Sequence, residues 1–400
     1  MTNYMKKLLL LTMLAACSMT SKIQAQSASQ TTFVTGADVS WCSEMEADGK
    51  LFYNANGEQT ELMALMKQIG MNVIRLRVWV NPENVYGNWS NKADVLAKAR
   101  RVKAQGLKLM IDFHYSDFFA DPGRQTKPAA WQNMTLDQLK QAVADHTTDV
   151  LQALKDEGIE PEWVQVGNET RVGMVWNEGK IDWSKTGSSV WSGYVALSNA
   201  GYDAVKQVLP QAQVIVHIDK GHEDNVWFFN QFKQYGGKFD VIGLSHYPTT
   251  SWASENTQVA SRIATLVNTF SVPVMIVETG YYQSNETLAE QVMTDLFDKT
   301  KGLNNFIGIL YWEPQLYSWW KPAYYTTLGW NAYDRGAFTS QGRPGKALNP
   351  FANHAESVTP LKLQANELPQ YFTIDGYATT PSTKGLVIVK EAHRTYKVVR

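Results

Sequence analysis

Two glutamates each follow a short apolar run of the sequence. Glu169 comes directly after residues 163–168, and Glu278 comes directly after residues 274–277. Both runs are typical of buried strands, and parallel α/β barrels place their catalytic groups at the carboxyl ends of such strands. Cleavage of a glycosidic bond requires one carboxyl group that protonates the leaving oxygen and a second that attacks the anomeric carbon or activates water. The pair therefore predicts a glycosidase, although either acid alone is also consistent with a solvated loop or a helix N-cap neighbour.

Polar and aromatic side chains also stand within or just after the other apolar runs. As candidates for binding the substrate or supporting the two acids we take Asp38, Trp41, Arg75, Arg77, Asp112, His114, Asp117, Asn168, His217, Asp219, His246 and Tyr247. In a parallel barrel the strand ends meet at one face, so these side chains are expected to converge there.

Arg75 and Arg77 are two residues apart in a predicted strand and should therefore share one face of it. An arginine inside a barrel is costly unless a carboxylate pairs with it. Next to Glu278, such an arginine would keep the acid ionised and lower its pKa. The alternative is a solvated arginine that packs against a helix.

Other reaction chemistries have weaker support in the sequence. No H-E-x-x-H, paired C-x-x-C or EF-hand spacing occurs, so we expect no metal and no cofactor. Asp112, His114 and Asp117 are interpreted as hydrogen-bonding groups rather than as cation ligands. No G-x-S-x-G motif is present to suggest a serine hydrolase.

The composition also limits the classes of binding partner that are expected. The net charge of −1 gives no electrostatic basis for binding nucleic acid. The chain has 14 Trp and 18 Tyr, and many of them fall in polar stretches where the apolar face of a sugar would be a suitable partner. Trp312, Trp320 and Trp330 follow the last predicted strand and are expected to stack on substrate, with Trp312 as the floor of the central subsite.

Apolar runs alternate with amphipathic helical patterns along most of the chain. The predicted strands are 33–39, 73–80, 107–113, 163–166, 214–218, 239–244, 274–277 and 306–311. Thr135 with Gln138, and Thr287 with Glu290, are predicted capping boxes. Eight such units favour an α/β fold of the (β/α)8 TIM-barrel type. A doubly wound sheet is the alternative, but no glycine-rich phosphate loop follows the first strand.

The two ends of the chain have a different character from the barrel. Residues 1–16 are predicted to be a lipoprotein-type signal peptide, Cys17 the lipidated residue, and 17–32 a flexible linker. Cleavage near Ala25 is the alternative. The barrel is expected over 33–355, and a small β-rich C-terminal extension over 356–400. With Cys17 lipidated or removed, Cys42 has no disulfide partner.

Residues 33–353 resemble glycoside hydrolase family 53, the endo-β-1,4-galactanases, in the clan of retaining (β/α)8-barrel glycosidases. The motifs that carry the resemblance are GADVSWCSEMEADGKLFYN, IRLRVWVNP, DFHYSD with ADPGRQTKPAAW, VQVGNET and IVETGYY, in this order along the chain. The resemblance implies a retaining enzyme that cleaves internal β-1,4 bonds of galactan in type I arabinogalactan and pectin. It also implies that Glu169 is the acid/base, Glu278 the nucleophile, and Asn168 the residue that binds the sugar 2-hydroxyl.

The sequence departs from the family pattern at three places. Phe119 stands where relatives usually have Trp, which would weaken a stacking subsite. His246 stands where they commonly have Tyr, which would alter the surroundings of the nucleophile. The loop at 281–286 has a single acid, so the calcium of some bacterial members is not expected.

The expected protein is therefore a monomeric lipoprotein at the outer membrane or cell surface of a Gram-negative bacterium, with galactan as its polymeric partner. Two alternatives stay open. One is another retaining β-1,4-glycanase of the clan, such as a mannanase or glucanase. The other is a non-catalytic glycan-binding lipoprotein, which would have no need for Glu169 and Glu278 together.

Overall fold

Eight parallel strands form a closed barrel in the computed structural model, which describes residues 33–82 and 87–354 and four strands between 370 and 399. The barrel strands are β1 Val34–Asp38, β2 Val73–Val78, β3 Lys108–Phe113, β4 Trp163–Val166, β5 Gln213–Ile218, β6 Val241–His246, β7 Val274–Thr279 and β8 Phe306–Trp312. Each strand pairs with its neighbour in sequence, and β1 pairs with β8 to close the barrel. The predicted TIM barrel is confirmed.

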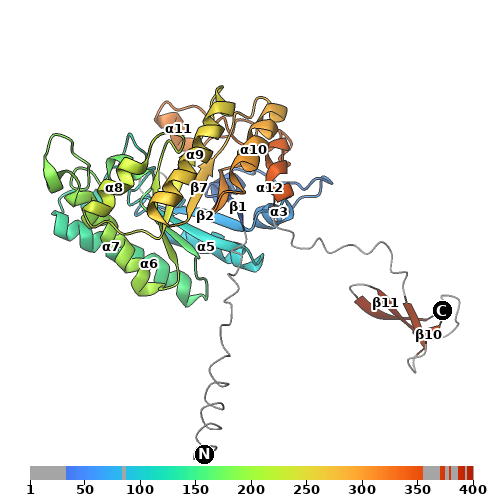
Figure 1. Cartoon of the computed structure of the whole chain (residues 1–400). Coiled ribbons are helices and arrows are strands. Elements are labelled where there is room, and N and C mark those ends of the chain that lie inside the picture. The colour runs from blue at the N-terminus through green and yellow to red at the C-terminus, as the bar shows by residue number, and fades with distance from the viewer. Residues whose placement is uncertain are drawn as a thin grey trace, which may run out of the picture. The chain divides into compact units, whose positions relative to one another are not determined.

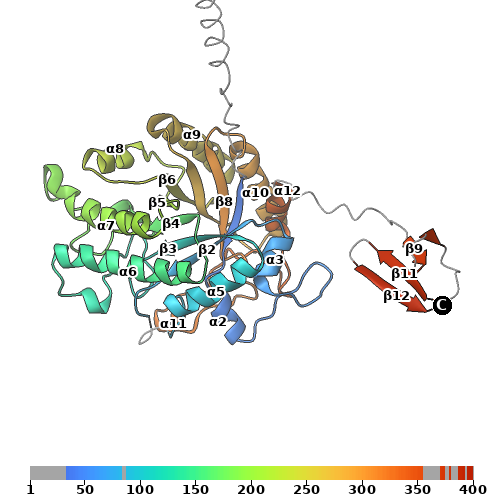
Figure 2. The same ribbon diagram turned by 90° about the horizontal axis from the view of Figure 1, so that it is seen from below.

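Helices surround the strands on the outside of the barrel, and α5, α6 and α7 lie next to one another along one side (Figure 1, Figure 2). The helices are α2 Cys42–Ala47, α3 Leu62–Gln68, α5 Lys92–Ala104, α6 Leu136–Asp156, α7 Ser192–Val208, α8 Val226–Gln234, α9 Trp252–Phe270, α10 Glu286–Thr300, α11 Ala323–Thr327 and α12 Asn349–His354. Most of the long ones bury an apolar stripe against the strands, which is the usual way that such helices are stabilised.

The two predicted capping boxes had different outcomes. Thr135 caps α6, and Gln138 returns the hydrogen bond as predicted. The box at Thr287 is wrong, because α10 begins earlier and Asn285 is its N-cap, accepting a hydrogen bond from the Leu288 amide at 3.0 Å. An asparagine is among the strongest N-cap residues, so the helix begins at Glu286, directly after Asn285.

The apolar core has two parts. A large cluster lies between the strands and the helices, while a smaller one consists of strand residues that face the barrel interior, such as Val34, Met110, Trp163 and Leu310. Several residues of the smaller cluster stand at the first positions of their strands. The apolar filling therefore occupies the amino-terminal part of the barrel and leaves its carboxyl-terminal end to polar side chains.

Two strand ends differ from prediction in a way that matters for the site. Both β6 and β7 continue two residues further than expected, so Glu278 lies within β7 rather than after it. The register between these strands shifts at Leu244 and Ser245. Glu278 therefore lies beside an irregularity of the sheet but still pairs with Ser245 of β6, which anchors its backbone at the strand end.

The predicted β-rich extension contains an antiparallel four-stranded sheet in the order β10-β9-β11-β12. Its strands are β9 Gln370–Thr373, β10 Ala378–Thr379, β11 Leu386–Glu391 and β12 Arg394–Val399. The predicted signal peptide, Cys17, the linker and the barrel end at 355 lie outside the described residues. Within the described part, no helix is long and apolar enough to cross a membrane.

Candidate active site

Glu278 reaches the mouth of the barrel from β7. One of its carboxyl oxygens lies 2.9 Å from a guanidinium nitrogen of Arg75, and the other accepts a hydrogen bond from the Tyr247 hydroxyl at 3.0 Å. The side chain lines a cavity at this end of the barrel and is 7% exposed. The carboxylate is therefore fixed on two sides and still accessible to a ligand in the cavity.

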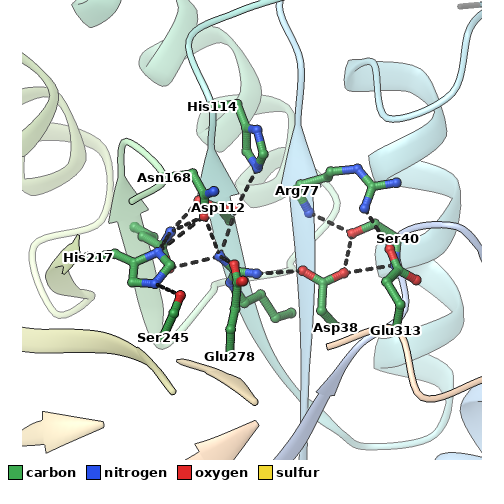
Figure 3. A network of polar contacts seen from close by, with 12 residues as sticks. Asp38, Ser40, Arg77, Asp112, His114, Asn168, His217, Ser245, Glu278 and Glu313 are labelled. Carbon is green, nitrogen blue, oxygen red and sulfur yellow. Dashed lines mark hydrogen bonds and ion pairs between the residues drawn. The ribbon is translucent and has the colours of Figure 1, made fainter. Parts of the chain in front are cut away.

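Arg75 is the centre of the polar network beneath this cavity. Its guanidinium lies 2.8 Å from Asp38 and 2.9 Å from Asp112, so with Glu278 three carboxylates converge on one cation. These three acids are labelled in Figure 3. It also donates to the Asn168 side-chain oxygen at 3.0 Å. A buried arginine needs such partners to offset its desolvation. The prediction that a β2 arginine meets Glu278 is confirmed for Arg75.

Glu169 follows β4 and is held by an unusual backbone conformation. Its φ of 48° lies in the left-handed region, which side chains other than glycine adopt rarely. Its amide donates to Nδ1 of His217 at 3.3 Å, and its side chain is hydrogen-bonded to Ser245. The left-handed turn is fixed by these contacts and places the carboxyl group at the cavity.

His217 of β5 contacts residues from both neighbouring strands, the Glu169 amide after β4 and the Ser245 side chain of β6. Burial, together with the charge of Arg75, lowers the pKa of His217 well below its usual value, so the ring is neutral. Because Nδ1 accepts from the Glu169 amide, the proton is on Nε2, which lies 2.8 Å from the Ser245 hydroxyl oxygen. His217 therefore donates to Ser245 and leaves the serine proton available for the Glu169 carboxylate.

The two acids have raised pKa values with partly different causes. Burial raises the pKa of Glu278 to about 7, and Arg75 opposes that rise without cancelling it. Burial, and next the charge of Glu278, raises the pKa of Glu169 well above its usual value, although its side chain is only partly buried where it faces the cavity. The expectation that arginine lowers the pKa of Glu278 overall is wrong, because one guanidinium shared by three carboxylates does not outweigh burial.

The cavity has a volume of about 280 Å³ and contains seven of the predicted site residues: His114, Asn168, Glu169, Tyr247, Glu278, Trp312 and Trp330. Phe119 also lines it. Sequence reasoning missed the others, which are Ala120, Asp121, Tyr325, Tyr333 and Arg335. Ala120 and Asp121 belong to the ADP motif that was recognised in the sequence, whereas the last three lie in the long connection after β8, where no periodic pattern marks them.

Arg77 forms a second ion pair away from Glu278. It lies 2.6 Å from Glu313, and its guanidinium is covered by the rings of Trp41, Trp79 and Phe119 at 5.1, 5.1 and 4.7 Å. Of the two arginines expected near the nucleophile, Arg77 is therefore the one that does not meet it. It fixes Glu313, the residue directly after Trp312 and β8.

Two other predicted residues point away from the cavity. Trp320 is buried and donates from its indole nitrogen to Asp48 at 2.8 Å, so it is not an exposed platform for substrate. His246 hydrogen-bonds Asn256 of α9 at 2.9 Å, on the helix side of β6, because neighbouring strand residues alternate between faces. The expected effect of His246 on the surroundings of Glu278 is not supported.

The remaining predicted residues have supporting positions. Asp117 accepts hydrogen bonds from the backbone amides of Asn81 and Ala129, which fixes loops near the barrel mouth. Asp219 pairs with Arg171 at 2.6 Å. Among the described residues, no group of three or more His, Cys, Asp or Glu side chains is arranged to hold a metal ion.

A cavity with one carboxyl group paired to an arginine, a second whose pKa is raised by burial and by the first, and an aromatic wall has the groups needed to cleave a glycosidic bond. The fold and the site thus define a barrel glycosidase, with one acid just after β4 and the other in β7. The family model described as "Glycosyl hydrolase family 53" matches residues 34–351, and the chain belongs to this family. The resemblance found in the sequence is confirmed.

The chain is similar over most of its length to proteins that are named as galactanases. It is 33% identical to an arabinogalactan endo-beta-1,4-galactanase of Cellvibrio japonicus, over 81% of this chain and 91% of that one. It is 30% identical to an endo-beta-1,4-galactanase of Bacillus subtilis, over 70% of each. Among solved structures, a fungal beta-1,4-galactanase superposes with a TM-score of 0.68 at 27% identity, covering 79% of this chain and 98% of that chain. The GH53 catalytic domain of Ignisphaera aggregans gives 0.68 at 26%, covering 81% and 97%.

Proposed function

We propose that this protein is an endo-acting, retaining β-1,4-galactanase that cleaves galactan side chains of type I arabinogalactan and pectin. The observation that carries the proposal is the meeting of Glu169 and Glu278 at one cavity in a family 53 barrel. The substrate class is supported by the two relatives described above, both named as endo-β-1,4-galactanases.

The reaction assigns one role to each acid. Glu278 attacks the anomeric carbon and forms a covalent glycosyl-enzyme, while Glu169 donates a proton to the leaving oxygen. Glu169 then removes a proton from water, which attacks the anomeric carbon and releases Glu278. Arg75 and Tyr247 orient the nucleophile through their contacts with its two oxygens. Asn168, fixed by Arg75 and by its donation to the Ala120 carbonyl at 2.8 Å, is placed to bind the 2-hydroxyl.

The stereochemistry of the first product tests this mechanism. Galactan should give a β-configured reducing end in an early NMR spectrum, because two inversions restore the original configuration. Retention requires carboxyl groups about 5–5.5 Å apart, whereas inversion requires roughly 6.5–9.5 Å. An α-configured first product would contradict the proposal, and so would faster release of reducing ends from mannan or cellulose derivatives than from galactan.

We also propose that the enzyme is an exported monomer anchored through lipidated Cys17. The support is the sequence Leu14-Ala15-Ala16-Cys17 after an apolar run preceded by two lysines. One acyl chain binds a membrane only marginally, so stable attachment needs several chains. The native protein should enter the detergent phase and Cys17→Ala should not. A soluble native protein whose N-terminus lies after residue 25 would overturn this part.

A further inference from the structure

Two tryptophans outside the cavity expose their rings side by side. Trp183 is 60% exposed and Trp227 is 39% exposed, and their ring centroids are 5.9 Å apart. Beneath them lies the buried ring of Trp191, with centroids 6.0 Å from Trp183 and 6.4 Å from Trp227. We call these three residues the tryptophan platform. Its rings are held by packing against each other, so a ligand would meet a surface that is already ordered.

The platform belongs to the same end of the barrel as the catalytic acids. Trp183 lies in the connection between β4 and α7, which also carries Glu169, and Trp227 lies in the first turn of α8, just after the β5 connection. Arg171 joins the two connections through contacts with Asp219 at 2.6 Å and Asn225 at 2.8 Å. The platform is thus built on the sector of the barrel that supplies the proton donor, and no residue of it lines the cavity.

A polymeric substrate must extend beyond the cavity. A volume of about 280 Å³ is near the lower end of the roughly 300–1,000 Å³ typical of small-molecule sites, so it encloses only the part of a polysaccharide around the scissile bond. Because Glu169 protonates the leaving group, the departing part of the chain lies on the side of the cleft to which Glu169 belongs. The tryptophan platform is built partly from the same connection after β4 that carries Glu169.

We propose that the tryptophan platform binds the leaving-group part of the β-1,4-galactan chain, outside the catalytic cavity. This inference rests on the proposed galactanase function. The axial O4 of each galactose unit leaves one face of the ring as a continuous surface of C–H groups, and such a surface stacks on an exposed indole. Galactan is neutral, and the exposed faces of Trp183 and Trp227 offer apolar surface without charge.

A second copy of the chain is a poorer occupant for this surface. Each tryptophan has at most about 250 Å² to bury, whereas a stable dimer buries about 800 Å² per partner. Apart from this pair, the large apolar side chains exposed in the described part of the chain are Leu51 and Trp319. The exposed apolar surface is therefore of the size of one or two sugar rings.

The binding test uses Trp183→Ala and the double variant Trp183→Ala/Trp227→Ala, each combined with Glu278→Gln to prevent turnover. The dissociation constant for long galactan, measured by affinity electrophoresis, should rise about tenfold in the double variant. Trp183→Phe should restore most of the binding. Trp319→Ala is the matched control, because Trp319 is 59% exposed in a different connection, and it should bind galactan as the parent does.

The kinetic test uses the active enzyme. Loss of the platform should raise KM for long galactan and leave both kcat and the activity on a short aryl galactoside unchanged, because uniform binding is removed. Unchanged binding of galactan by a folded double variant would overturn the inference, as would equal losses in Trp319→Ala. A platform-dependent dimer detected by light scattering would also overturn it. Failure of the parent enzyme to cleave galactan would instead refute the proposed function.

Discussion

Arg75 and Arg77 enter the barrel from the same face of β2, and each meets a glutamate whose pKa is raised to about 7. Glu278 keeps a face open to the cavity. Glu313 is fully buried, and its acceptor oxygens are used by Arg77, by the Trp41 amide at 3.2 Å and by the Gln315 side chain at 2.6 Å. Two similar ion pairs with similar pKa values therefore have different roles. Access, and not pKa, separates the reactive carboxylate from the structural one.

The largest loss of activity should follow removal of Glu278, the accessible carboxylate. Glu278→Ala should lower kcat on the order of 10⁴-fold or more, as removal of a covalent nucleophile does. Added azide should restore turnover by attacking from the vacated side, and the product should be an α-galactosyl azide. A variant with substantial activity in the absence of azide, or a β-configured azide, would show that Glu278 is not the nucleophile.

Glu169 extends the comparison to an acid that forms no ion pair in the described part of the chain. Glu169→Ala should lower kcat on galactan by about 10²–10⁴-fold. It should spare the first step with aryl galactosides that have good leaving groups, because these need little protonation. Burst kinetics with such a substrate would measure the two steps separately. Equal losses on galactan and on the activated substrate would contradict the assignment.

Substitution of the structural carboxylate, Glu313, should lower the stability of the protein and leave kcat nearly unchanged. Glu313→Gln turns an amide N–H₂ toward groups that all donate, so the free energy of unfolding should fall by about 1–3 kcal/mol. Glu278→Gln should lose less, because Arg75 keeps Asp38 and Asp112. Urea unfolding of both variants measures this difference. A loss of kcat in folded Glu313→Gln comparable to that of Glu278→Gln would remove the distinction between the two pairs.

The smallest expected effect is a shift in the pH dependence of kcat/KM. Activity should rise as Glu278 loses its proton near pH 7 and fall at higher pH as Glu169 loses its own, so kcat/KM should follow a bell-shaped curve. Tyr247→Phe removes a hydrogen bond that lowers the pKa of Glu278, and the acid limb should move up by less than about one pH unit. Glu169→Gln should lose the alkaline limb. An acid limb that moves down in Tyr247→Phe would contradict this account.

Much of the barrel was predictable because its strands are apolar runs, and the helices between them have N-cap residues that can be recognised in the sequence. The ends of strands were less predictable, since β6 and β7 continue into polar residues that hydrophobicity alone assigns to loops. Helix starts depended on competition between neighbouring caps, and for α10 Asn285 prevailed over Thr287.

The site was predictable where strand geometry alone determined it. Glu169 and Glu278 converge because the ends of parallel strands share one face, and the period of two would also have placed His246 outward and Gln165 inward. The partner of Arg77 could not be predicted, because that choice depends on the path of the connection after β8. The same connection supplies Tyr333 and Arg335 to the cavity and buries Trp320, through long-range packing that no local pattern records.

The convergence of three carboxylates on Arg75 gives the cluster around this arginine more carboxylates than cations. Asp38, Asp112 and Glu278 share a single guanidinium, and the neutral ring of His217 adds no cation. Hydrolysis passes through a sugar ring that carries positive charge. The negative charge of this cluster is present before the substrate binds. It therefore stabilises the positively charged transition state more than the neutral sugar of the ground state. The buried electrostatics of β1, β2 and β3 thus contribute to the reaction without touching the bond that breaks.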